Sequence, residues 1–186
     1  MGKEIIMVKL LLGLLVVFSV IGSFPCSAQV ASNGFFVEFD ATINAASSEV
    51  YGALVDDVSQ WWNPEHTYSG KSKNLSIDAR PGGCFCEKLA GGGGLEHLRV
   101  VYADPGKLLR FSGGLGPLQA YGIAGSLSWN LSDESGATKI NLTYSVGGYI
   151  EDGFEEIAPA VEYVVGDQLK RLQLFLETGK PVQDGD

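Results

Sequence analysis

From residue 35 to residue 146, short stretches rich in strand-forming residues are separated by turns, and one long amphipathic helix follows them. The helix is predicted over 153–178, where apolar residues recur at helical spacing and charged residues cover the other side. A short helix is predicted over 48–57. Strands are predicted at 35–44, 74–79, 84–89, 95–103, 108–112, 122–131 and 137–146. Short turns join sequential strands in antiparallel order, so we expect an α+β domain with about seven strands.

The first 28 residues have the layout of a secretory signal peptide. Lys3 and Lys9 precede an uncharged apolar stretch at 10–24, and small residues end the segment at Ser27 and Ala28. An uncleaved anchor is the alternative, although a spanning helix needs about 20 apolar residues. Cleavage would place the protein in the periplasm or the medium of a bacterium. The expected organisation is a signal peptide at 1–28, a polar lead at 29–34, one domain at 35–178 and a polar tail at 179–186.

The composition excludes several classes of function. Hydrophobic residues make up 45% of the chain and charged residues 19%, which is typical of a globular domain. Acidic residues outnumber basic ones by 22 to 13, and a net charge of −9 argues against binding to nucleic acid or anionic lipid. Two histidines and three cysteines are too few for a zinc-ribbon or disulfide scaffold. We therefore expect no metal, no cofactor and no stable membrane association after cleavage.

Three motifs resemble the SRPBCC superfamily, also described as the START-like or helix-grip fold. They are WWNPEHTYSG at 61–70, PGGCFCE at 81–87 and VYADPGKLL at 101–109. The similarity is closest to the polyketide cyclase-like proteins and the relatives of the Hsp90 ATPase activator. It implies a curved antiparallel sheet that grips the C-terminal helix, with a cavity between them. Members include lipid and hormone carriers, cyclases, hydrolases and co-chaperones, so the fold alone does not select an activity.

Strand pairing predicts which side chains face this cavity. Leu131 opposite Thr138 places Trp129 beside Ile140, and the proline turn places Phe111 opposite Val100. The resulting inner face consists of Cys84, Cys86, Leu98, Val100, Tyr102, Leu109, Phe111, Leu127, Trp129, Ile140, Leu142 and Tyr144. The outer face then carries Phe85, Glu87, His97 and Arg99. A one-residue slip in the glycine turn at 91–94 would exchange the two cysteines with Glu87 and His97.

Cys84 and Cys86 have two interpretations. They share one face of a strand, at a Cα separation near the limit for a disulfide. With His66 or His97 they could ligate zinc. The favoured interpretation is that they are two small buried thiols that line the core.

The two histidines are the candidate catalytic residues. Glu87 is expected beside His97 across the strands, where a carboxylate would orient the imidazole for general acid–base chemistry; a solvated charge cluster is the alternative. His66 follows Trp61 and Trp62 in a loop that, in the resembling fold, closes over the cavity mouth. These tryptophans either stack on a ligand or plug the end of the core. The glycine-rich stretch at 113–118 is expected at the cavity entrance.

Three functions remain open. The first is an exported module that binds a small apolar or aromatic molecule, with ligand contacts expected from Trp61, Trp62, His66, Cys84, Cys86, Tyr102, Phe111, Trp129 and Tyr144. The second is a cyclase or dehydratase acting on a carbonyl or polyketide-like substrate, in which His66 or the His97–Glu87 pair moves a proton. The third is a protein-interaction domain. An imidazole that faces the cavity would distinguish the second from the first.

Overall fold

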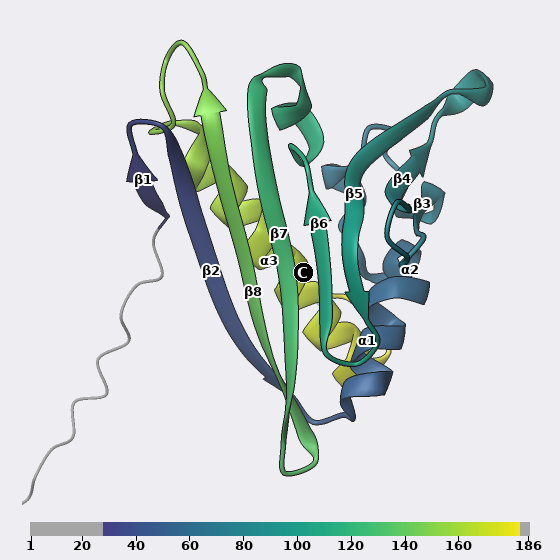
Figure 1. The fold of residues 1–186 in the computed structure, drawn as a ribbon. Coiled ribbons are helices and arrows are strands. Elements are labelled where there is room, and N and C mark those ends of the chain that lie inside the picture. The colour runs from purple at the N-terminus through teal and green to yellow at the C-terminus, as the bar shows by residue number, and fades with distance from the viewer. Residues whose placement is uncertain (1–27, 183–186) are drawn as a thin grey trace, which may run out of the picture.

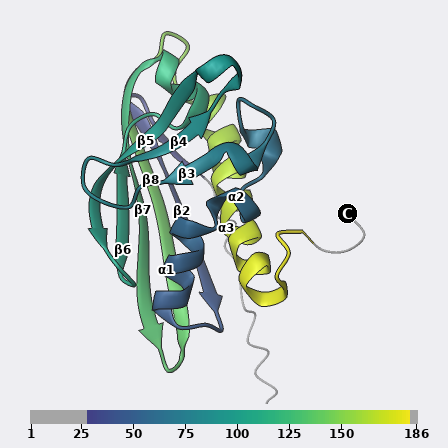
Figure 2. The ribbon, with the colours of Figure 1, turned by 90° about the vertical axis from the view of Figure 1, so that its right-hand side faces the viewer.

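A single curved antiparallel sheet of eight strands lies over a long C-terminal helix in the computed structural model, which describes residues 28–182. The order of strands across the sheet is β1-β2-β8-β7-β6-β5-β4-β3. Figure 2 shows that α1, α2 and α3 all lie on one face of the sheet. The elements are β1 (Gln29–Ala31), β2 (Gly34–Ile43), α1 (Ser47–Asp56), α2 (Val58–Trp61), η1 (Pro64–His66), η2 (Ser72–Asn74), β3 (Leu75–Ile77), β4 (Cys84–Lys88), η3 (Ala90–Gly92), β5 (Gly94–Asp104), β6 (Leu108–Ser112), η4 (Gly116–Ala120), β7 (Gly122–Glu134), β8 (Ala137–Tyr149) and α3 (Ile157–Thr178).

The predicted α+β, helix-grip fold is confirmed, with differences at both ends of the domain. Part of the expected polar lead is a strand, because β1 folds back on β2 through the turn at Ser32 and Asn33. The last helix begins at Ile157 rather than near Gly153, whose φ of +78° is not helical. It ends at Gly179, as expected, with a left-handed cap. The predicted signal peptide falls almost wholly outside the described residues.

The β7–β8 register differs from the predicted one by two residues. Leu131 pairs with Ile140 instead of Thr138, and Trp129 pairs with Leu142. Because side chains alternate with a period of two, this shift leaves the same residues facing α3. The inner residues of both strands are accordingly buried in one core with the helix.

Two bulges in β5 change the predicted faces of residues in β4 and in β5 itself. His97 is the extra residue opposite β4, so Cys84 pairs with Arg99 and Cys86 with Glu96. The cysteines therefore lie on the outer face, and the assignment of Cys84 and Cys86 to the inner face is wrong. Phe85 and Glu87 point inward instead and are each 2% exposed.

The second bulge lies at Val101. Val100 pairs with Phe111 as predicted, but Tyr102 pairs with Arg110 rather than Leu109. Val101 and Tyr102 both face solvent, and Tyr102 is 46% exposed. The expectation that Tyr102 contacts a ligand in the cavity is therefore wrong. Across residues 28–182, no helix combines the length and apolar character that membrane crossing requires.

Candidate functional pocket

A pocket of about 330 Å³ opens between the first half of α3 and the sheet. Its walls come from four places: the segment around η1, the bulge of β5, the η4 loop and the apolar side of α3. Most of its lining is apolar, and two imidazoles supply part of its polar surface. The lining residues are Trp62, Glu65, His66, Thr67, Tyr68, His97, Leu115, Gly116, Pro117, Leu118, Ile157, Ala160, Val161 and Val164.

His97 lies in the wall of this pocket because the bulge in β5 turns it inward together with Leu98. Its Nε2 is 2.9 Å from Oε2 of Glu87, and both side chains are almost fully buried. A carboxylate can only accept a hydrogen bond, so the hydrogen of a neutral His97 lies on Nε2. Its Nδ1 therefore presents a lone pair, and this buried atom has no hydrogen-bond partner among the described residues.

Glu87 also anchors the segment that forms the rim of the pocket. Its Oε1 accepts a hydrogen bond from the amide of Ser69 at 2.6 Å, and its Oε2 accepts one from the amide of Tyr68 at 3.0 Å. One carboxylate thus positions both the imidazole and the loop that carries Tyr68.

The pKa shifts of Glu87 and His97 favour the protonation states in which His97 can accept a proton. Burial pushes the pKa of Glu87 upward, but hydrogen bonds from Ser69, Tyr68 and His97 outweigh it and hold that pKa below its usual value. Burial lowers the pKa of His97, and the Glu87 carboxylate only partly opposes this effect. At neutral pH the pair is therefore an ionised carboxylate and a neutral imidazole that can accept a proton.

His66 lies in the pocket wall, near α3. Its Nε2 is 4.0 Å from Oδ2 of Asp167 and has no hydrogen-bond partner among residues 28–182. The side-chain Nδ2 of Asn63 donates to the same Asp167 oxygen at 2.9 Å. The backbone N–H of Asn63 donates to Oε1 of Gln168, also at 2.9 Å. The Trp62 indole donates to the His66 carbonyl at 3.0 Å. These bonds fasten the loop to the helix with His66 in the pocket wall.

The η4 loop closes the third side and is tied to the sheet by side chains. The Tyr144 hydroxyl accepts from the Leu115 amide and donates to the Gly113 carbonyl, both at 2.9 Å. Burial raises the pKa of Tyr144 to about 12, so the hydroxyl stays protonated and can make both bonds. The Gln119 side chain donates to the His97 carbonyl at 3.2 Å and to the Glu96 carbonyl. Residues 115–118 of the glycine-rich stretch line the pocket, and their expected place at its entrance stays a prediction.

The sequence-predicted site residues fall into three groups. Trp62, His66 and His97 line the pocket, and Glu87 lies behind His97. Four others are buried in the core and are absent from the pocket lining: Trp61, Phe111, Trp129 and Tyr144. Cys84, Cys86 and Tyr102 lie on the outer face of the sheet.

The two cysteines form a disulfide with a Cα–Cα distance of 5.4 Å. The expectation of two free thiols in the core is therefore wrong. Within the described part of the chain, no group of three or more His, Cys, Asp and Glu side chains is arranged to hold a metal ion.

The contribution of α3 to the pocket was not assigned from the sequence. Ile157, Val161 and Val164 lie on its predicted apolar stripe, and all three line the pocket together with Ala160. The stripe was therefore a usable signal. The stripe does not show at which point along α3 the sheet leaves space for a pocket, because that depends on the tertiary packing.

Comparisons with known proteins identify the fold and no more. No protein-family model matches the chain, and no curated protein matches it in sequence. Among solved structures, DynU16 of the dynemicin biosynthetic locus aligns with a TM-score of 0.57 and 23% identity over 78% of this chain and 48% of that one. This chain thus spans about half the length of DynU16.

Two further structures match over most of their own length. CalU16 from Micromonospora echinospora aligns with a TM-score of 0.54 and 16% identity, covering 82% of this chain and 85% of that one. The Aha1 dimer protein from Colwellia psychrerythraea gives a TM-score of 0.54 and 20% identity, covering 78% and 98%. The chain therefore shares the helix-grip architecture of these proteins.

Proposed function

We propose that the protein binds a small apolar or aromatic molecule in the pocket between α3 and the β5 bulge. The observation that carries this proposal is an apolar pocket of about 330 Å³ with a buried, unpartnered imidazole nitrogen in its wall. An engineered apolar cavity of about 150 Å³ holds one benzene molecule. The pocket is about twice that size, so a ligand with two fused rings is the expected scale.

The polar handle of this ligand follows from the His97–Glu87 pair. Because Nδ1 of a neutral His97 can only accept, a ligand that reaches this atom would donate a hydrogen bond to it, as a phenol or alcohol does. A buried acceptor left without a donor is unfavourable, so a hydroxylated ligand binds better than its hydrocarbon analogue.

Titration with 2-naphthol and naphthalene, measured by isothermal titration calorimetry, tests this function. A neutral hydrogen bond contributes about 0.5–1.5 kcal/mol, so 2-naphthol should bind roughly 2- to 12-fold more tightly. H97Q keeps a donor toward Glu87 but removes Nδ1, and it should abolish this preference. Y102F changes an outward-facing residue and serves as the matched control. Failure of both compounds and their larger analogues to bind would refute the proposal.

The same pair favours a second candidate, an enzyme of the cyclase or dehydratase type. A neutral imidazole oriented by a buried carboxylate at 2.9 Å can remove an acidic proton next to a carbonyl group. The bicyclic ketone 2-tetralone, incubated in D₂O, reports this step as exchange of its α-hydrogens by NMR. Exchange faster than in buffer, and lost in H97Q, would support an enzyme. Exchange at the buffer rate despite binding would leave a binding protein.

We also propose that the protein is exported from the cytoplasm. The signal-peptide pattern at 1–28 supports it, and so does the Cys84–Cys86 disulfide, since disulfides persist mainly in oxidising compartments. The mass of the protein produced with its own N-terminus tests this point. Cleavage after Ala28 supports export, and an intact mass would indicate an anchor or an internal protein.

A further inference from the structure

The Cys84–Cys86 disulfide joins two residues of one strand and so fastens no separate parts of the fold. Its sequence separation is 2. A disulfide stabilises a fold mainly by constraining the unfolded chain, and the shortest loops gain the least. Strand β4 is already paired with β3 on one side and β5 on the other. The bond therefore adds little to the stability of the sheet.

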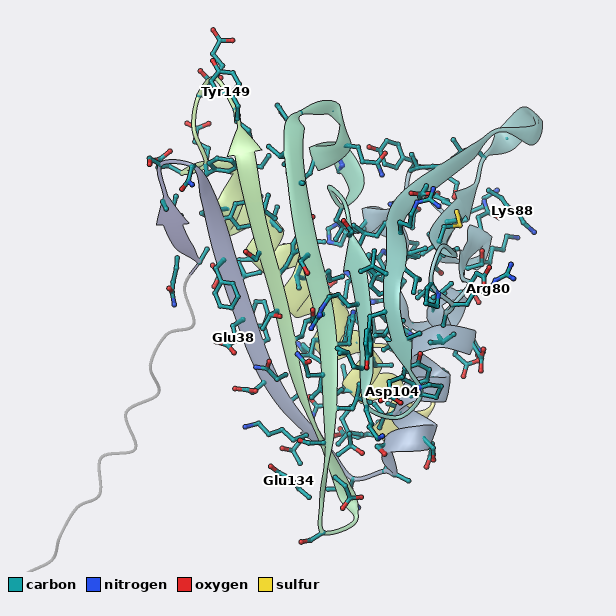
Figure 3. All side chains as sticks on the ribbon, in the orientation of Figure 1. Glu38, Arg80, Lys88, Asp104, Glu134 and Tyr149 are labelled. Atoms are coloured by element: carbon teal, nitrogen blue, oxygen red, sulfur yellow. A yellow bond between two sulfur atoms is a disulfide. The ribbon has the colours of Figure 1, made fainter. Side chains whose placement is uncertain are left out.

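The two sulfur-bearing residues lie on the outer face, away from the hydrophobic core. Cys84 and Cys86 are partly exposed, whereas Phe85 and Glu87 alternate with them and are buried. Figure 3 draws the disulfide in yellow on this part of the sheet, in the neighbourhood of Lys88. A thiol in solution can therefore approach the bond without unfolding the domain.

The neighbours of the two cysteines carry opposite charges. Arg99 pairs with Cys84 across the strands, and Glu96 pairs with Cys86. Residues paired in this way have adjacent side chains on the same face of the sheet. A nearby guanidinium stabilises a thiolate and a nearby carboxylate destabilises one. Arg99 and Glu96 also bond to each other at 2.6 Å, so their charges partly offset. The remaining asymmetry favours Cys84 as the leaving group and Cys86 as the sulfur that an incoming thiolate attacks.

We propose that Cys84 and Cys86 form a thiol–disulfide exchange site that accepts two electrons from a dithiol. A thiolate of the dithiol attacks Sγ of Cys86, the Cys84–Cys86 bond breaks, and its electron pair leaves on Sγ of Cys84. The second thiolate of the dithiol then attacks the dithiol sulfur that is bonded to Cys86. This closes the cyclic disulfide and releases the Cys86 thiolate. The products are two reduced cysteines, which take up the two protons, and the oxidised cyclic dithiol.

A change in the redox state of the two cysteines should also affect the pocket, because Phe85 lies between them in the sequence and packs against pocket residues. Its ring centroid is 4.9 Å from that of Trp62 and 4.9 Å from that of His97. Opening the disulfide removes the cross-link that spans Phe85, while the pairing of Phe85 with Ile77 and Leu98 remains. The tryptophan fluorescence of the protein, to which Trp62 contributes, should therefore change together with the redox state.

The test uses the full chain with Cys26→Ser, which removes the third cysteine. The native protein is equilibrated with mixtures of reduced and oxidised glutathione and of reduced and oxidised dithiothreitol. Free thiols are then alkylated and counted by mass spectrometry. We expect one two-electron transition within the glutathione mixtures, accompanied by the change in tryptophan fluorescence.

Single-cysteine variants test the assigned roles. With Cys84 as the free thiol in C86S, alkylation near neutral pH should be several-fold faster than with Cys86 free in C84S. Adding Arg99→Gln should remove most of that difference. A pair that resists reduction until the protein is unfolded would overturn the proposal, and so would two thiols that stay reduced in oxidised glutathione. Neither result depends on the ligand of the pocket.

Discussion

Replacing Glu87 with Gln removes the charge of the buried carboxylate but keeps its size. One carboxylate oxygen accepts from the Ser69 amide at 2.6 Å, and the other accepts from the Tyr68 amide at 3.0 Å and lies 2.9 Å from His97 Nε2. A glutamine places one oxygen and one NH₂ group in these positions. Whichever way the amide is turned, one backbone N–H then faces another donor.

The cost of this change follows from the hydrogen bonds. A buried donor without an acceptor costs about 1–3 kcal/mol, and the remaining bonds lose their charge assistance. We expect E87Q to lower the free energy of unfolding by about 2–3 kcal/mol. For a domain of this size, that corresponds to a fall in Tm of about 4–12 °C.

Urea denaturation followed by tryptophan fluorescence measures this loss. E96Q is the matched control, because Glu96 is an exposed carboxylate on the neighbouring strand that bonds to Arg99 at 2.6 Å. An exposed pair of this kind contributes about 0–1 kcal/mol. Equal losses in E87Q and E96Q would show that the Glu87 carboxylate does not hold the rim segment as described.

Three other predictions concern pH and the η4 loop. The pKa of His97 is depressed from 6.5 in the folded protein, so the unfolded chain binds more protons below that pH, and stability should fall as the pH drops below about 6.5. H97Q should flatten this part of the stability profile in urea titrations, and an unchanged profile would contradict the assignment. Y144F removes the hydroxyl that bonds to Gly113 and Leu115, so it should cost about 1–2 kcal/mol and speed hydrogen exchange at the Leu115 amide; unchanged exchange there would count against the tether. G125A would place a Cβ 2.6 Å from the Tyr144 ring and 2.8 Å from the Gly113 carbonyl, so it should lower the Tm, and a variant as stable as the native protein would show that this packing is loose.

The sequence was sufficient for the architecture because the fold depends on strong local signals. Turn residues marked the strand ends, and the apolar stripe marked α3. The register error between β7 and β8 changed nothing on the faces, since a shift by two residues preserves them. Each predicted β7–β8 pair was displaced by two residues, but no side chain changed face.

The site was harder to predict because it depends on the two bulges in β5. A bulge adds one residue and exchanges the faces, and no residue type at His97 or Val101 identifies it in advance. The sequence therefore predicted that Glu87 and His97 are neighbours but placed them on the wrong side of the sheet. The same error placed Cys84 and Cys86 inside.

The most direct test of the proposed function is a methyl NMR titration of the protein with 2-naphthol. We expect shifts confined to methyl groups that line the pocket, on Leu115, Leu118, Val161 and Val164. The methyl groups of Val30, on the β1 hairpin outside the pocket, should not move. Saturable shifts restricted to the pocket would support a ligand held between α3 and the β5 bulge. Shifts centred at Val30, or no saturable shift with any bicyclic phenol, would contradict it.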